Sequence, residues 1–142
     1  MSIMGRNKGK RAERQAADFL YSISSAVAEE FGKVAPKVER NLQQTRGGGY
    51  DLIGTLDFAV EVKHHETLNL NAWWEQACTQ AVNAGMRPIL MYRQNNKPWR
   101  IQMYLYHQLE NGGRIKVRSD ITLEAFKTIW EWECRQYYGR NV

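Results

Sequence analysis

The spacing of apolar residues predicts three amphipathic helices. Apolar positions recur at intervals of three and four through residues 9–31, which is typical of one long helix with a single buried side. A second helix is expected to begin at a cap of Asn69 or Asn71 and to end at Gly85. A third begins near Thr122 and keeps apolar residues at helical spacing to about residue 138.

Shorter apolar runs, separated by segments rich in Gly, Asn and Pro, predict strands. Apart from a short strand between residues 36 and 41, we expect strands at residues 50–53, 58–63, 88–93, 99–105 and 114–117. The order of helices and strands indicates an α/β fold with a central mixed β-sheet flanked by helices. We expect one domain over residues 1–142, with a basic N-terminal arm at about 1–9 and a C-terminal helix at about 122–138.

Composition narrows the class of protein. A chain of 142 residues can bury a core as one domain without disulfides, so Cys78 and Cys134 are expected to be reduced, structural thiols. Lys and Arg number 20 against 15 for Asp and Glu, and the resulting net charge of +5 favours a polyanionic partner. No apolar run approaches the roughly 20 residues of a membrane span, and no signal-type stretch follows the basic start. These features predict a soluble, cytoplasmic protein that does not contact membranes.

Three charged residues on the predicted strands at 50–53 and 58–63 form a candidate site. Glu61 and Lys63 stand two residues apart in an otherwise apolar strand, so their side chains share one face. Asp51 lies on the preceding strand, which we expect to form a hairpin with the Glu61 strand. A three-residue loop places Asp51 opposite Glu61, whereas a two-residue loop places it opposite Val60. Hydrophobic patterning favours the first register, because all the charge then lies on one face.

Two converging carboxylates beside a lysine suit metal-assisted hydrolysis of a phosphodiester. Magnesium favours one or two carboxylates completed by water and substrate phosphates, and a cation between the two acids relieves their repulsion. The ion acidifies a bound water, while Lys63 can orient that water or stabilise the developing negative charge. In the alternative interpretation, Glu61 and Lys63 are a solvated ion pair on a surface hairpin.

The residues at 49–52 and 60–63 resemble the PD-(D/E)xK nuclease superfamily, in which an acid on one strand precedes Glu-x-Lys on its neighbour. The stretch Gly-Lys-Arg-Ala-Glu at residues 9–13 is similar to the helix start of archaeal-type and phage Holliday junction resolvases. Tyr50 departs from the pattern, because it stands where the motif has proline. The resemblance covers residues 6–81 and implies a restriction-endonuclease-like core and a Mg²⁺ cofactor that Mn²⁺ can replace.

The resemblance adds two residues to the candidate site. Glu13 matches the acid that members carry on the first helix, which implies that it joins Asp51 and Glu61 as a metal ligand. Gln76 matches a glutamine that several branches place near the catalytic lysine. Without the resemblance, Glu13 could equally be an exposed acid that offsets the neighbouring arginines.

Basic residues around the first helix are candidate phosphate contacts. The residues expected to bind DNA are Arg6, Lys8, Lys10, Arg11, Arg14, Arg46 and His64. A solvated basic tail and an ordinary polar strand end are the alternatives for this set. The aromatic residues of the last helix are expected to be packing residues, within the fold or between subunits: Trp130, Trp132, Tyr137 and Tyr138.

The function predicted from these features is a homodimeric, magnesium-dependent endonuclease that cuts branched DNA, as a Holliday junction resolvase does. Two-fold symmetry would present one active site to each of two strands. One alternative is a restriction-type or repair nuclease that acts on linear or damaged duplex. The other is a protein that binds DNA on the same fold without catalysis.

Overall fold

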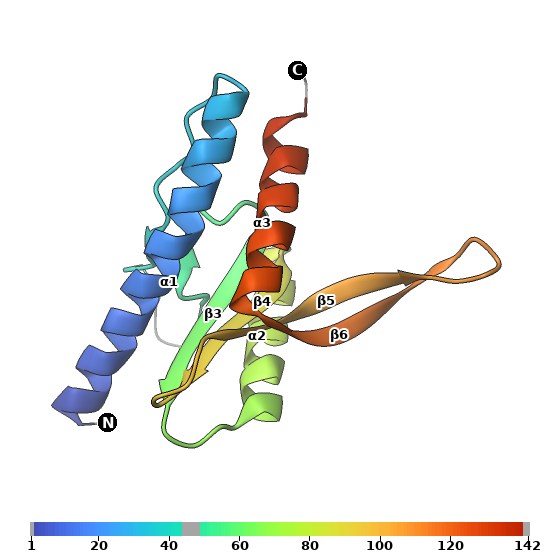
Figure 1. Cartoon of the computed structure of the whole chain (residues 1–142). Helices are drawn as coiled ribbons and strands as arrows, with labels where there is room; N and C mark the ends of the chain where they lie inside the picture. The colour runs from blue at the N-terminus through green and yellow to red at the C-terminus, as the bar shows by residue number, and fades with distance from the viewer. Residues whose placement is uncertain (1, 44–48, 141–142) are drawn as a thin grey trace.

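The computed structural model describes residues 2–43 and 49–140. Helices and strands alternate in the order predicted from the sequence (Figure 1). The elements are α1 (Ile3–Glu30), β1 (Glu39–Arg40), β2 (Leu52–Ile53), β3 (Phe58–His65), α2 (Leu70–Ala84), β4 (Arg87–Gln94), β5 (Arg100–Gln108), β6 (Arg114–Thr122) and α3 (Leu123–Tyr138).

A four-stranded mixed sheet forms the centre of the molecule. Its order is β3-β4-β5-β6, with β3 and β4 parallel and the other neighbours antiparallel. The crossover from β3 to β4 runs through α2, as parallel neighbours require. The structure thus confirms the prediction of an α/β fold with a mixed sheet flanked by helices.

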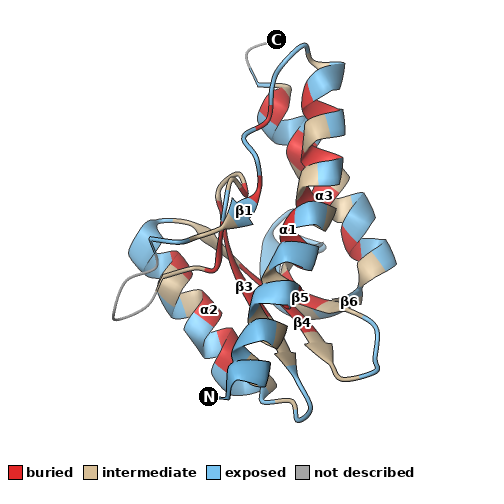
Figure 2. Ribbon diagram, turned by 90° about the vertical axis from the view of Figure 1, so that its left-hand side faces the viewer, coloured by how far each residue is buried: buried red, intermediate tan, exposed pale blue. Residues whose placement is uncertain are grey.

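The two faces of the sheet pack against different helices. On β3, Phe58, Val60 and Val62 join the core shared with α1 and α3. Leu90 and Tyr92 of β4 face the other way and pack with the tryptophans of α2. Figure 2 shows buried residues along β3 and on one side of each helix. The alternation along β3 therefore turns Glu61 and Lys63 toward the α2 face.

Helix α1 begins earlier than the sequence pattern indicated. Ser2 caps it, because its Oγ accepts a hydrogen bond of 3.0 Å from the Gly5 N–H. The expected N-terminal arm is therefore wrong for residues 3–9, which form the first turns of the helix. These turns lack apolar periodicity because they extend past the core, so the hydrophobic pattern could not reveal them.

The predicted hairpin between residues 50–53 and β3 is also wrong. β2 pairs instead with β1, with Arg40 opposite Leu52. The backbone contact with β3 is a hydrogen bond of 2.9 Å from the Asp51 N–H to the Val60 carbonyl, which sets Asp51 beside Val60 rather than Glu61. Gly54 directs this path, because its φ is +81° and a Cβ there would clash with the Lys37 carbonyl.

The expected short strand before residue 41 is confirmed as β1, and Gly85 ends α2 in the left-handed conformation. On α3, Trp130 is fully buried and its indole N–H donates to the Leu20 carbonyl at 3.2 Å. Tyr138 is also buried, which confirms packing for these two aromatics, whereas Trp132 and Tyr137 are exposed. Cys78 and Cys134 are free thiols, as expected.

Strands β5 and β6 run well past the end of β4. The β4–β5 pairing reaches Met103 opposite Ile89, whereas the β5–β6 pairing continues to Gln108 opposite Arg114. We call residues 104–118 the β5–β6 arm, which projects from the sheet in Figure 1. Both strands are longer than the apolar pattern predicted, because polar and charged residues replace that pattern toward the ends of β5 and β6. In the part of the chain that the structure describes, no helix is long and apolar enough to cross a membrane.

Candidate active site

A cleft of about 420 Å³ opens between the first turns of α1, the end of β3 and α2. Its walls include all five residues predicted for the catalytic site and four of the seven predicted DNA contacts. The predicted residues among its lining are Arg6, Lys8, Lys10, Glu13, Asp51, Glu61, Lys63, His64 and Gln76. The fold thus brings together side chains from four separate segments of the chain.

Asp51 is fixed by two consecutive hydrogen bonds to the outer edge of β3. Its N–H donates to the Val60 carbonyl, and its Oδ2 accepts from the Val62 N–H at 2.8 Å. The residue is 8% exposed. The carboxylate therefore reaches the Glu61 region from the edge of the strand. Asp51 and Glu61 are therefore neighbours, as predicted, although the predicted hairpin register is wrong.

Glu61 is the most unusual carboxyl group of the site. It is 1% exposed, and its Oε1 has no hydrogen-bond partner among the described residues. Burial, together with repulsion by Asp51, raises the pKa of Glu61 to about 9, although Lys63 acts in the opposite direction. At neutral pH the metal-free protein therefore holds this carboxyl in its protonated form.

Lys63 and the two histidines after it lie where β3 leaves the core. Lys63 is half-buried and close enough to Glu61 to favour the ionised carboxylate. Desolvation lowers the pKa values of His64 and His65, and nearby cations add to this effect: Lys8 for both histidines and Lys63 for His65. The His65 ring lies 5.0 Å from that of Trp73, so this histidine is placed by packing on α2.

Glu13 lies at the cleft but is engaged by a residue that the sequence analysis missed. Its Oε2 accepts a hydrogen bond of 2.9 Å from Nε of Arg40 on β1. Burial nevertheless raises the pKa of Glu13, and the nearby Asp51 contributes to this increase. No spacing rule could have identified Arg40, because the pairing of β1 with β2 places it there.

The other predicted residues have different positions. Gln76 is an exposed residue of α2 that lines the cleft beside Lys63. Arg11 does not line this cleft, although its charge acts on His64. Arg14 lines a separate cleft of about 970 Å³ along residues 37–43. Arg46 lies outside the described residues.

The donor set fits a hard divalent cation. The described residues contain no group of three or more His, Cys, Asp or Glu arranged as a metal site. Magnesium does not need one, since it binds through one or two carboxylates and keeps waters and substrate oxygens as its other ligands. The buried Oε1 of Glu61 without a partner, beside the Asp51 carboxyl, is the kind of oxygen that such an ion would take up.

One protein family has a sequence model that matches most of this chain. The model of a family described as "Phage putative PDDEXK endonuclease" matches residues 4–134. The chain belongs to this family. The match covers the cleft and α3 as far as Cys134, so it extends beyond the region of the sequence resemblance. Membership confirms the predicted likeness to PD-(D/E)xK nucleases, and the chain is a nuclease by family.

The chain was also compared with solved structures and with curated proteins. The Holliday junction resolvase Hjc of the archaeal hyperthermophile Archaeoglobus fulgidus, solved at 1.6 Å, is 18% identical over 85% of this chain and 96% of that chain. The TM-score between the two structures is 0.48. No curated protein matches the chain significantly.

Proposed function

We propose that this PD-(D/E)xK family member is a magnesium-dependent endonuclease whose active site consists of Asp51, Glu61 and Lys63, assisted by Glu13 and Gln76. The observation that carries the proposal is the buried Glu61 carboxyl, which has one oxygen without a partner and lies beside Asp51. A protein gains no stability from such an arrangement, because a buried polar atom without a hydrogen bond costs free energy. A role in binding a cation and a phosphate explains its presence.

Asp51 and Glu61 would hold the ion, with Glu13 within electrostatic reach of both. When bound, magnesium supplies charge neutralisation at the scissile phosphate and lowers the pKa of a water. Mn²⁺, another hard cation with oxygen ligands, would substitute for it. The Glu61 proton must leave for the carboxylate to serve as a ligand, so metal binding at neutral pH releases a proton.

The chain's own side chains then position the substrate. The Lys63 ammonium can donate to the attacking water or to a phosphate oxygen as negative charge develops there. The exposed amide of Gln76 lies at the same wall and can hold that water or phosphate in place. Arg6, Lys8 and Lys10 border the cleft and would bind the flanking phosphates.

Cleavage of plasmid and oligonucleotide DNA in Mg²⁺ tests the chemistry. Glu61→Ala and Lys63→Ala should each lower the single-turnover rate by about 100-fold or more, the usual effect of losing one group that stabilises the transition state. Glu29→Gln is the matched control, because Glu29 is exposed near the C-terminal end of α1. This variant should cleave DNA at the wild-type rate. Wild-type rates in either alanine variant would show that the site is wrongly assigned.

Within this proposal, the substrate is branched DNA, and a homodimer makes paired nicks across a four-way junction. Contacts from the basic border of the cleft would go to phosphates, so they would recognise DNA shape rather than sequence. A closed dimer would offer one site to each of two strands. We further propose that the whole chain is one nuclease domain that acts in the cytoplasm.

Side-by-side cleavage of a four-way junction and a matched linear duplex tests the substrate. Preference for the junction, with a sedimentation coefficient that corresponds to a dimer, supports resolution of junctions. Equal rates on both substrates would instead indicate a restriction-type or repair nuclease. Tight binding without product in Mg²⁺ or Mn²⁺ would indicate a DNA-binding protein without catalysis.

A further inference from the structure

The β5–β6 arm carries positive charge that the candidate active site does not use. Residues 104–118 contain three cations, Arg114, Lys116 and Arg118, against one acid, Glu110 at the tip. All residues from 114 to 118 are exposed. We propose that this arm is a second DNA-binding surface, which holds backbone phosphates of double-stranded DNA outside the cleft. This inference deepens the proposed nuclease function and rests on it.

The three cations share one face of the arm. They alternate along β6, so their side chains point the same way, and their partners on β5 are Gln108, Tyr106 and Tyr104 in that order. Ile115 and Val117 lie between these cations along β6, so their side chains point to the opposite face. The arm is therefore a two-sided ribbon, with basic and aromatic side chains on one side and apolar ones on the other.

Aromatic rings support the cations without neutralising them. Nζ of Lys116 lies 4.2 Å from the centre of the Tyr104 ring, and the Arg114 guanidinium lies 5.0 Å from that of Tyr106. Cation–π contact orients a charge but leaves it available to an anion. No ion pair involves Arg114, Lys116 or Arg118 within residues 2–43 and 49–140.

The base of the arm is held more firmly than its tip. Arg118 donates to the Gln102 side-chain oxygen at 2.8 and 3.0 Å, and to the Asn71 side chain on α2 at 3.0 Å. Its guanidinium also lies 5.3 Å from the Trp74 ring of α2. These contacts fix the direction in which the basic face points. A fixed orientation of the basic face would let the arm bind one part of a DNA molecule while another part lies in the cleft.

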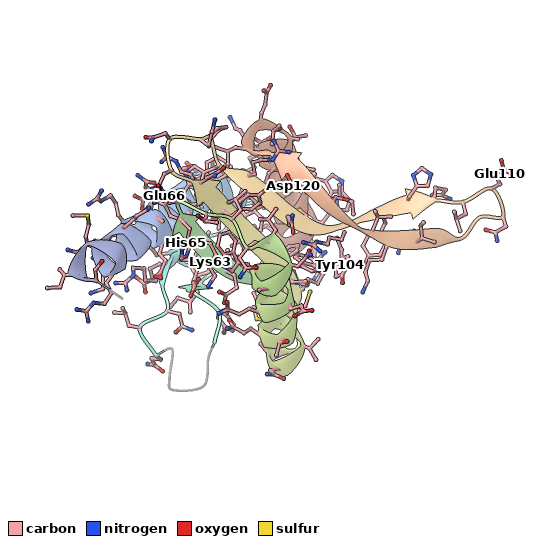
Figure 3. All side chains as sticks on the ribbon, turned by 90° about the horizontal axis from the view of Figure 1, so that it is seen from below. Lys63, His65, Glu66, Tyr104, Glu110 and Asp120 are labelled. Carbon is pink, nitrogen blue, oxygen red and sulfur yellow. The ribbon has the colours of Figure 1, made fainter. Side chains whose placement is uncertain are left out.

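The basic face of the arm belongs to the same side of the sheet as the active site. Glu61 pairs with Leu90, Leu90 pairs with Gln102, and Gln102 pairs with Asp120. Directly paired residues point to the same face of a sheet, so Asp120 lies on the same face as Glu61. Arg118 and Lys116 are two and four residues from Asp120, so they share its side. Figure 3 shows Lys63 and His65 on one side of α2, Tyr104 on the other, and Glu110 at the tip.

The dimensions fit a duplex. The paired part of the arm beyond β4, from Tyr104 to Gln108, spans roughly 15 Å at about 3.3 Å per residue. A two-stranded ribbon of this kind is also narrow enough to enter a major groove. A duplex whose scissile phosphate lies in the cleft, or a second duplex branch of the same substrate, would meet positive charge again at the arm.

The double substitution Arg114→Gln with Lys116→Gln tests the proposal. Both residues are exposed, and Arg118 is left intact to keep the base of the arm in place. Binding of a labelled linear duplex and of a labelled four-way junction is measured in EDTA over a range of salt concentrations. Loss of two phosphate contacts should reduce the slope of log K against log salt by about 1.8 and weaken binding between about 10- and 60-fold at about 0.1 M salt.

A matched control loses the same charge elsewhere. Lys127→Gln with Arg140→Gln removes two exposed cations, one on α3 and one just after it. This variant should leave the slope of log K against log salt unchanged. Arg114→Lys with Lys116→Arg conserves the charge and should restore wild-type binding. In Mg²⁺, the arm variant should raise KM while kcat at saturating DNA stays at the wild-type value.

The outcomes separate this inference from the nuclease proposal. If wild-type protein cuts nothing, the nuclease proposal fails while the binding difference can still be measured. Equal salt slopes for the arm variant and the control would overturn the arm proposal and leave cleavage intact. A sedimentation coefficient that changes in the arm variant would also overturn it, because the arm would then serve as contact between two copies.

Discussion

Replacing Glu61 with glutamine should make the metal-free protein more stable while removing cleavage. Glutamine has nearly the shape of a protonated glutamate, so it fits the same buried position without any ionisation. In the wild type, burial and Asp51 raise the pKa of Glu61 from 4.5 to about 9. The folded protein must therefore retain a proton that the unfolded chain releases.

The sign and size of the effect follow from proton linkage. Between about pH 5 and pH 8 the folded state binds one more proton than the unfolded state, so the free energy of unfolding falls as pH rises. The slope for one such group is at most about 1.4 kcal/mol per pH unit. At pH 7.5 the accumulated cost reaches up to about 4 kcal/mol relative to pH 4.5. Glu61→Gln lacks this cost, so its advantage should grow with pH.

Urea unfolding in EDTA at several pH values between about 5 and 8 measures this difference. Glu75→Gln is the control, because Glu75 is exposed on α2 and should change the free energy of unfolding by less than about 0.5 kcal/mol. A stability difference between Glu61→Gln and wild type that stays constant over this pH range would refute the reasoning.

Three further outcomes follow from the same geometry. Asp51→Ala should speed amide hydrogen exchange at Val62 by about tenfold or more, because that N–H loses its carboxylate acceptor; NMR detection of unchanged exchange would contradict the bond. Gly54→Ala should lower the free energy of unfolding by about 1–3 kcal/mol, since φ of +81° and the Lys37 carbonyl both oppose a Cβ; a wild-type urea midpoint would count against this turn. Mg²⁺ at about 100 times its Kd should stabilise wild type by about 2.7 kcal/mol and leave Glu61→Ala almost unchanged; equal thermal shifts would place the ion elsewhere.

The parts of the site that the sequence could predict are those encoded by local periodicity. Glu61 and Lys63 share a face because strand residues alternate, and no tertiary information is needed to see it. Asp51 was predicted as a neighbour of Glu61, but from a hairpin that does not form. Its place beside Glu61 depends on pairing with β1 and on the turn at Gly54, which are set by contacts distant in sequence.

Other features lay beyond hydrophobic patterning. Arg40 meets Glu13 across a separation of 27 residues, and no spacing rule reports such a contact. The first turns of α1 and the last residues of β5 and β6 lack the apolar periodicity of the core, so the pattern did not show how far these elements extend. The period-two alternation of Arg114, Lys116 and Arg118 was visible in the sequence and could have indicated a longer strand.

The attachment of Asp51 to β3 has a consequence for how this chain avoids aggregation. β3 is an edge strand, and unpaired groups on an edge invite pairing with a strand from another molecule. Here the Asp51 N–H and carboxylate occupy the Val60 carbonyl and the Val62 N–H, and Thr55 occupies the next groups along, at Phe58. Asp51 and Thr55 thus cover this part of the edge against strand addition, so Asp51 would protect solubility in addition to its proposed role in DNA cleavage.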